Sequence, residues 1–363
     1  MMMKILFIVI VILLVVLGKY LSRISSMRSI KKITCYNDYN LYKMNVLYNY
    51  DIEKILSQRL EYDQDFMNLI SKVALPYLPI SIKSPNFGGC SAFTIKEKSG
   101  AVLMGRNYDF KNNTSAMLVH CAPQNGYKSV SFCALDNLKV QNADATLKSK
   151  LACLCAPFAC LDGINEKGVC IAVLTLDSEP VKQNTGKNTI ATSLVIRLVL
   201  DKAATTEEAI NLLKKYDMHA MSGRDYHFYI TDALGDGRVV EYDPKTKERV
   251  LVATPSQAVT NFFIMYKEHV LPNQKNGIYG HGKERYDAIV DIMEKNEQNL
   301  NTDVAWQALK AASQAPNPKD ITSNTQWSIV FNTKELSAAI AIRRDWDIVN
   351  KYYLTTNELQ LLK

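Results

Sequence analysis

The sequence lacks the common signatures of metal and disulfide sites. It has no CxxC pair, no HExxH motif and no Cys/His pattern at zinc-finger spacing, and its five histidines and eight cysteines are irregularly spaced. Zinc sites and disulfide frameworks depend on regular spacing. We therefore expect neither a metal nor another cofactor, and we expect most cysteines to be small buried apolar residues.

Long runs of one charge are also missing. The 43 Lys and Arg residues exceed the 36 Asp and Glu residues by seven, and they are spread along the chain. Nucleic-acid-binding proteins concentrate basic residues on one surface, so this pattern predicts no nucleic-acid partner. With 363 residues, of which 47% are hydrophobic, the chain is long enough to bury an enzyme-sized core.

Residues 5–17 form an unbroken apolar run, preceded by Lys4. The run is shorter than the roughly 20 residues that a helix needs to cross a bilayer, and it is closer to the apolar part of a signal peptide. We predict that residues 1–21 are a signal or anchor segment and that the protein is exported or membrane-associated through it. Basic residues follow the run and no small-residue cleavage site does, so the orientation and the removal of the segment stay open.

Residues 22–89 form a predicted prosegment, and residues 90–363 a predicted catalytic domain. The Pro- and Gly-rich stretch 84–89 indicates an exposed, flexible junction directly before Cys90. Beyond it, strand-like runs come first, helical spacing follows, and strands return. Strands are expected at 91–95, 101–106, 116–121, 129–135, 169–176, 226–231, 238–242, 249–253, 258–260, 327–332 and 338–343, a turn at 162–168, and helices within 190–216, 284–294 and 303–312. This order predicts an α+β fold with antiparallel sheets covered by helices.

Cys90 opens the first predicted hairpin, and Arg106 and Asp109 lie at the end of its second strand. The start of one hairpin strand neighbours the end of the other, so both charges can reach Cys90. A nearby Arg favours the thiolate of a thiol whose pKa is ordinarily about 8.5. If the chain is cut before Cys90, the new α-amino group, with a pKa of about 7.7 to 8.0, can accept the thiol proton. This chemistry needs no histidine.

The motifs around Cys90 resemble the choloylglycine hydrolase and acid-amidase group of N-terminal-nucleophile (Ntn) hydrolases, which includes bile salt hydrolases, penicillin V acylases and N-acylethanolamine amidases. Arg106 and Asp109 follow the cysteine at the same spacing as in that family. The matching stretches are Gly89-Cys90-Ser91-Ala92-Phe93, Gly105-Arg106-Asn107-Tyr108-Asp109-Phe110, Asp162-Gly163-Ile164-Asn165-Glu166-Lys167-Gly168, Val259-Thr260-Asn261, Glu284-Arg285-Tyr286 and Thr325-Gln326-Trp327-Ser328.

This resemblance implies a role for each matching residue. Cys90 is the implied nucleophile, with its own α-amino group as the base. Arg106 is expected to tune the thiolate and Asp109 to hold the amino group. Asn261 is expected to donate its side-chain amide to the oxyanion hole, and Arg285 to complete the charge network.

One position departs from the pattern of bile salt hydrolases. Thr175 aligns with the place where they carry a second oxyanion Asn, so a backbone N–H or the Thr hydroxyl is expected to serve instead. This departure points away from conjugated bile salts as substrates. The resemblance also implies a four-layer αββα sandwich of two antiparallel sheets, and self-cleavage by attack of the cysteine on the preceding carbonyl, at Gly89–Cys90. Gly suits the acyl side of that bond because it has no Cβ to obstruct attack.

The sequence thus predicts a self-processed cysteine Ntn hydrolase that cleaves linear amide bonds of small N-acyl substrates through a thioester acyl-enzyme. Apolar stretches at 116–119, 151–158 and 262–266 suggest a pocket for an apolar acyl group. Three alternatives stay open: an acyltransferase of the same fold with an amine acceptor, a catalytically silent membrane-tethered homologue, and a Cys-His thiol protease with His227 or His120 as base. The sequence does not decide whether the chain forms a homo-oligomer.

Overall fold

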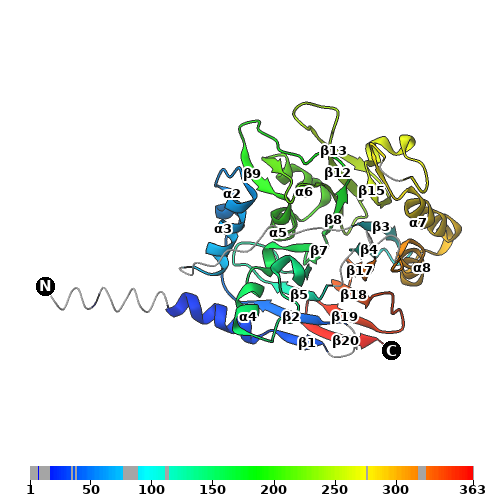
Figure 1. Ribbon diagram of the computed structural model, residues 1–363. Coiled ribbons are helices and arrows are strands. Elements are labelled where there is room, and N and C mark those ends of the chain that lie inside the picture. Colours follow the sequence, from blue (N-terminus) through cyan, green and yellow to red (C-terminus); the bar gives the residue numbers. More distant parts are fainter. Residues whose placement is uncertain are drawn as a thin grey trace.

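Two large sheets form the centre of the computed structural model, which describes residues 7, 17–33, 36, 39–76, 89–110, 114–274, 277–317 and 324–362 (Figure 1). In spatial order, the nine-stranded sheet contains β1 (Lys31–Ile33), β2 (Leu41–Val46), β5 (Ala116–Cys121), β6 (Ser129–Ala134), β7 (Cys160–Asn165), β8 (Cys170–Leu176), β11 (Asp225–Thr231), β12 (Arg238–Tyr242) and β13 (Leu251–Pro255). The seven-stranded sheet contains β14 (Ala258–Val259), β3 (Cys90–Lys96), β4 (Val102–Asp109), β17 (Thr325–Asn332), β18 (Ser337–Ile342), β19 (Val349–Tyr353) and β20 (Glu358–Leu362).

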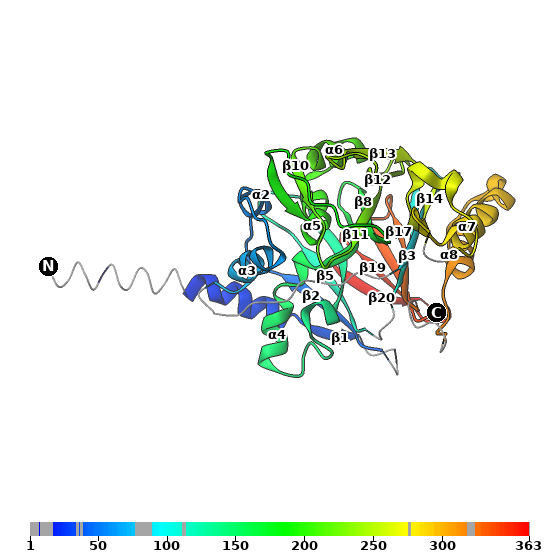
Figure 2. The same cartoon turned by 45° about the horizontal axis from the view of Figure 1, so that its top comes forward.

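Helices cover the outer faces of the two sheets. In Figure 2, α7 (Lys283–Lys295) and α8 (Thr302–Ala312) lie on the right, α5 (Thr192–Lys202) lies on the left, and the strands run between them. α5 packs against β7 and β8, whereas α7 and α8 pack against β3 and β4 of the other sheet. The layers therefore follow the order αββα, and the predicted α+β fold is confirmed.

Smaller elements complete the fold. The helices are residues 17–28, α2 (Ile52–Leu56), α3 (Asp63–Ala74), α4 (Leu147–Cys153) and α6 (Thr206–Leu213), with 3₁₀ turns η1 (Leu135–Leu138), η2 (Ala156–Phe158), η3 (Ile264–His269) and η4 (Glu297–Asn299). Two further strand pairs are β9 (Asn188–Ala191) with β10 (Tyr216–His219), and β15 (Asn261–Phe262) with β16 (Gly280–His281). The expected turn at 162–168 is wrong in its first half, because residues 162–165 belong to β7 and only the residues after them turn.

The N-terminal segment, defined as the described residues between 17 and 76, is built into this core. β2 pairs with β5 in parallel, which departs from the expected purely antiparallel sheets. The hydroxyl of Tyr36 accepts a hydrogen bond from Asn350 Nδ2 (2.8 Å), so the segment also touches β19 of the other sheet. Arg23 Nε and Nη2 donate to the carbonyls of Ala74 and Val73, both at 2.7 Å, and thereby satisfy the last turn of α3. The sequence predicts that these residues are a prosegment. In the structure, β1 and β2 of the segment belong to the nine-stranded sheet.

Among the described residues, no helix has the length and apolar character needed to cross a membrane. The apolar run 5–17, on which the predicted signal or anchor segment rests, lies outside the described residues except for Phe7 and Leu17. The membrane-directed role of residues 1–21 therefore stays a prediction.

Candidate active site

The β3–β4 hairpin places Cys90 beside the end of the strand that follows it. Cys90 is the first residue of β3 and pairs with Tyr108, so its neighbour across the hairpin is the residue before Asp109. The turn is tight because Gly100 adopts a φ of 83°, a conformation that favours glycine. The Cys90 side chain is buried, as are those of Arg106 and Asp109. The predicted hairpin is confirmed, and it brings these three residues together.

The side chain of Arg106 lies between the two sheets and makes polar contacts with the nine-stranded sheet, opposite its own strand. Its Nε faces Asp162 Oδ2 on β7 at 3.3 Å, and its Nη2 donates to the carbonyl of Val173 on β8 at 3.0 Å. Burial raises the pKa of the Cys90 thiol above its usual range, and the guanidinium of Arg106 opposes that rise without cancelling it. Burial therefore favours the thiol of Cys90 over the thiolate, and the thiol proton needs an acceptor before the sulfur can attack.

Asn261 lies at the start of β15 and binds the backbone of Cys90. Its Oδ1 accepts hydrogen bonds from the Cys90 N–H (3.0 Å) and from Arg285 Nη2 (2.8 Å). Its Nδ2 faces the other way and contacts the carbonyl (2.9 Å) and hydroxyl (3.2 Å) oxygens of Thr175. Thr175 thus orients Asn261, whose amide N–H₂ donates to Thr175 in this structure.

Arg285 joins three parts of the site from the first turn of α7. Its Nη1 donates to the Cys90 carbonyl at 2.9 Å and lies 3.6 Å from Asp109 Oδ2. Gly282, which precedes α7, has a φ of 89°. A Cβ on Gly282 would lie 2.3 Å from Arg285 Nη2, so glycine at this position leaves room for the guanidinium.

Gly89, the residue before Cys90, continues the hairpin ladder beyond β3. Its carbonyl oxygen accepts a hydrogen bond from the backbone N–H of Asp109 at 2.8 Å. On the other side of the same peptide bond, the nitrogen of Cys90 donates to Asn261. Both ends of the Gly89–Cys90 peptide are therefore held by residues of the site.

Asp109 is held by two residues to which the sequence assigns no role. Thr325 Oγ1 donates to its Oδ1 at 2.6 Å, and Gln314 Nε2 donates to its Oδ2 at 2.7 Å. Burial raises the pKa of the Asp109 carboxyl, while Arg285 and these two hydrogen bonds oppose the rise. Thr325 and Asp162 lie in the motifs that carry the resemblance, whereas Gln314 follows α8 without any recognisable local signal.

The histidines considered as alternative bases lie elsewhere. His227 uses both ring nitrogens, with Nδ1 facing Glu241 Oε1 at 3.1 Å and Nε2 facing the carbonyl of Thr260 at 2.9 Å. His120 lies on β5, where its ring centre is 6.5 Å from that of Tyr352. Neither histidine therefore lies beside Cys90, where it could act as a base. Among the described residues, no group of three or more His, Cys, Asp or Glu side chains could hold a metal ion.

Asp162 should make stability depend on pH. Burial raises its pKa to about 6, although Arg106 opposes this, whereas an unfolded Asp titrates near 3.9. The folded state then binds the proton more tightly, so this group lowers the free energy of unfolding progressively as the pH rises from about 4 to about 6. We expect the difference in that free energy between wild type and Asp162→Asn to change by about 3 kcal/mol across this window, measured by urea unfolding. The exposed Asp291→Asn control should follow wild type, and parallel curves for Asp162→Asn would contradict the prediction.

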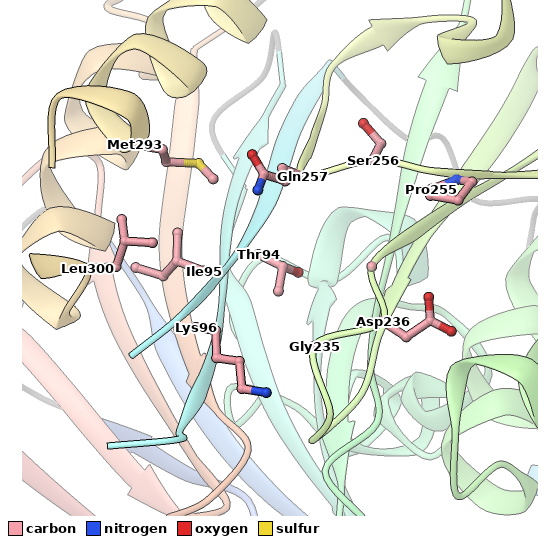
Figure 3. A pocket seen from close by; sticks show the side chains of 11 residues that line it. Thr94, Ile95, Lys96, Gly235, Asp236, Pro255, Ser256, Gln257, Met293 and Leu300 are labelled. Atoms are coloured by element: carbon pink, nitrogen blue, oxygen red, sulfur yellow. The ribbon is translucent and has the colours of Figure 1, made fainter. Parts of the chain in front are cut away.

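A cavity of about 450 Å³ opens at the other end of β3 (Figure 3). Thr94, Lys96 and Gln257 are among the residues that line it, and Cys90 is not. None of the apolar stretches expected to form an acyl pocket lines it either. Residues 116–119 are buried in β5, and 153–158 are buried around η2, so these two stretches belong to the core.

Residues 90–261 match the model of a protein family described as linear amide C–N hydrolases, choloylglycine hydrolase family. No curated protein matches the chain. Among solved structures, a variant of the conjugated bile acid hydrolase from Clostridium perfringens is similar, with a TM-score of 0.55, 16% identity, and coverage of 76% of this chain and 96% of that one. The penicillin V acylase from Agrobacterium tumefaciens is also similar, with a TM-score of 0.53, 17% identity, and coverage of 76% and 98%. At these identities the structures establish a shared fold, that of the Ntn hydrolases.

Proposed function

Because residues 90–261 belong to the choloylglycine hydrolase family of linear amide C–N hydrolases, we propose that the chain cuts itself at Gly89–Cys90 and then hydrolyses N-acyl amides with Cys90. That the protein is a hydrolase of linear amides follows from the family and the fold. The cysteine nucleophile, the self-cleavage and the substrate class are the proposed part.

The hydrogen bonds on the Gly89–Cys90 peptide are the observation that carries the proposal. Attack by Cys90 Sγ on the Gly89 carbonyl carbon places negative charge on the carbonyl oxygen, which the Asp109 N–H already contacts at 2.8 Å. Donors at about 2.7–3.1 Å from such an oxygen stabilise the tetrahedral intermediate. The other side of the peptide, the Cys90 nitrogen, is oriented by Asn261. The uncut chain therefore resembles an enzyme with its first substrate bound.

Self-cleavage proceeds in two steps with balanced atoms. The C–S bond forms, the C–N bond between Gly89 and Cys90 breaks, and the thiol proton ends on the nitrogen, which becomes the α-amino group of Cys90. Water then hydrolyses the thioester, which leaves a carboxylate on Gly89 and restores the thiol. Burial raises the pKa of the Cys90 thiol and so disfavours loss of its proton in the first step, whereas the charge of Arg106 favours that loss.

Hydrolysis of an external amide repeats this chemistry with the new α-amino group as base. The amino group accepts the thiol proton, Sγ attacks the substrate carbonyl, and the proton passes to the leaving amine. Water then releases the acid from the thioester. Asp109 and Asn261 are placed to hold the α-amino group, because Asn261 already binds this nitrogen and Asp109 ends the adjacent strand. An amine that replaced water would make the same intermediate serve acyl transfer.

The substrate proposed is a small N-acyl amide. Thr175 stands where bile salt hydrolases carry an Asn, and this chain uses it to bind Asn261. We therefore propose that conjugated bile salts are poor substrates. Residues 1–21 are proposed to direct export or membrane association, on the apolar run 5–17 alone.

Intact-mass measurement and N-terminal sequencing of the purified protein test the proposal. We expect two polypeptides, one ending at Gly89 and the other running from Cys90 to Lys363. The cut protein is then tested with N-acyl amino acids, N-acylethanolamines, penicillin V and conjugated bile salts, with and without an added amine. A single 40.9 kDa chain without activity would identify a catalytically silent homologue instead.

A further inference from the structure

The uncut chain shows where the acyl group of a substrate lies. Gly89 supplies the acyl part of the bond that is cut, so the atoms around its Cα mark the acyl side of the site. A Cβ built on Gly89 would lie 3.6 Å from Asn261 Oδ1, 3.8 Å from Asp109 Cβ and 4.0 Å from Gln314 Nε2. These are ordinary van der Waals distances. One methyl group therefore fits on the α carbon of Gly89. The further carbons of a larger substituent lie about 1.5 Å beyond that methyl group and come closer to these three neighbours.

Gln314 is the neighbour that the proposed chemistry leaves without a role. Asn261 and Asp109 contact the peptide that is cut, through the Cys90 nitrogen and the Gly89 oxygen. Gln314 Nε2 would lie 4.0 Å from a Cβ on Gly89, on the acyl side, and it donates to Asp109 Oδ2 at 2.7 Å.

The backbone of Gln314 is fixed on both sides. Its N–H donates to Thr325 Oγ1 at 2.7 Å, and its carbonyl accepts from the Thr325 N–H at 2.9 Å. The same carbonyl accepts from Arg344 Nη1 at 2.8 Å. A side chain held at its amide and at its backbone resists displacement by a bulky group, so Gln314 forms a firm boundary of the site.

We propose that Gln314 is a specificity-determining residue that limits the second substituent on the α carbon of the acyl group to about the size of a methyl group. The substrates would be amides of acids with a CH₂ group, or a CH group bearing one methyl, next to the carbonyl. This inference rests on the proposed function, since it takes Gly89 as the first acyl group.

Self-cleavage itself supplies the assay, so no substrate has to be identified. Gly89→Ala should cut faster than Gly89→Val, and Gly89→Val should cut about tenfold more slowly than wild type. In a Gln314→Ala background, the rate ratio between the Gly89 and Gly89→Val forms should shrink about tenfold, a coupling typical of residues in contact. Comparing the ratio in the Gln314→Ala background with the ratio in wild type cancels two separate effects. These are the effect that Val alone has on the backbone and the effect that Gln314→Ala alone has on Asp109. Rates are followed by gel after dilution from denaturant, with circular dichroism as a check on folding.

Gln326 offers a matched control, because it is another buried glutamine whose side chain binds the backbone of Thr114 and Asn324. Gln326→Ala should leave the Gly89→Val ratio as in wild type. If Gln314→Ala does not fold, Gln314→Asn, which shortens the side chain by one carbon, supplies the same comparison. An unchanged ratio in the Gln314 background overturns this inference alone. Absence of any cut in the wild-type chain overturns the proposed function instead.

Discussion

A Cys90→Ala variant is expected to accumulate as one uncut chain and to lose amide hydrolysis by roughly a millionfold, the scale seen when a hydrolase loses its nucleophile. Both proposed steps pass through a thioester on this sulfur, so the two losses should occur together. The side chain is only 1% exposed, and replacing sulfur by hydrogen leaves a small cavity, so the fold should survive. Intact mass, circular dichroism and an amide-hydrolysis assay on the same preparation measure all three properties.

Another buried cysteine provides the control for this variant. Cys170 lies on β8 with no exposed surface, and the site geometry gives it no role. Cys170→Ala should therefore be cut and remain active. Cys90→Ser should be cut slowly, because a hydroxyl is a weaker nucleophile at neutral pH. A Cys90→Ala chain that is still cut at residue 89 would assign self-cleavage to another group.

The N-terminal segment is expected to remain bound to residues 90–363 after the proposed cut. Eleven large apolar or aromatic side chains of this segment are at most 4% exposed: Leu41, Tyr42, Met44, Tyr48, Ile52, Ile55, Leu56, Phe66, Met67, Ile70 and Leu75. Each fully buried side chain of this kind contributes about 1.5–3 kcal/mol before the entropy cost of ordering is subtracted, so exposing these side chains to water would strongly oppose release of the segment. We expect the two polypeptides to co-elute on size exclusion and to separate only under denaturing conditions. A chain that begins at Cys90 should fail to fold.

A pair of variants on α3 tests whether packing retains the segment. Ile70→Asp places a charge in the core, where Ile70 has no exposed surface, and should release the segment or prevent folding. Tyr62→Asp alters a side chain that is 69% exposed just before the same helix and should leave the complex intact. An active catalytic domain that elutes alone from wild type would contradict the expectation.

The sequence predicts the hairpin around Cys90 well because its determinants are local. The strand pattern, the glycine turn and the positions of Arg106 and Asp109 all lie in the single stretch from Cys90 to Asp109. The nine-stranded sheet is less predictable at its edge. β2 is a short strand whose parallel partner, β5, follows only after two helices and the β3–β4 hairpin, and no local pattern identifies such a partner.

The contacts that orient the site are also absent from any local pattern. Gln314 reaches Asp109 from 205 residues away, and Thr175 reaches Asn261 from 86 residues away. The family resemblance marks Asn261 as important, but only the three-dimensional hydrogen bonds show which end of its amide faces Cys90. Residue type can be read from the sequence, whereas orientation depends on neighbours that the fold supplies.

The parallel pairing of β2 with β5 would determine how the two polypeptides depend on each other if the proposed cut occurs. A parallel pair cannot be closed by a tight turn, and here the connection passes through α2, α3, the Gly89–Cys90 bond and the β3–β4 hairpin. A cut inside this crossover converts a link within one molecule into an association between two. The free energy of unfolding would then depend on protein concentration, and dilution would lower it. We therefore expect folding to be complete before the proposed cut, so that the proposed activation depends on a single successful folding event.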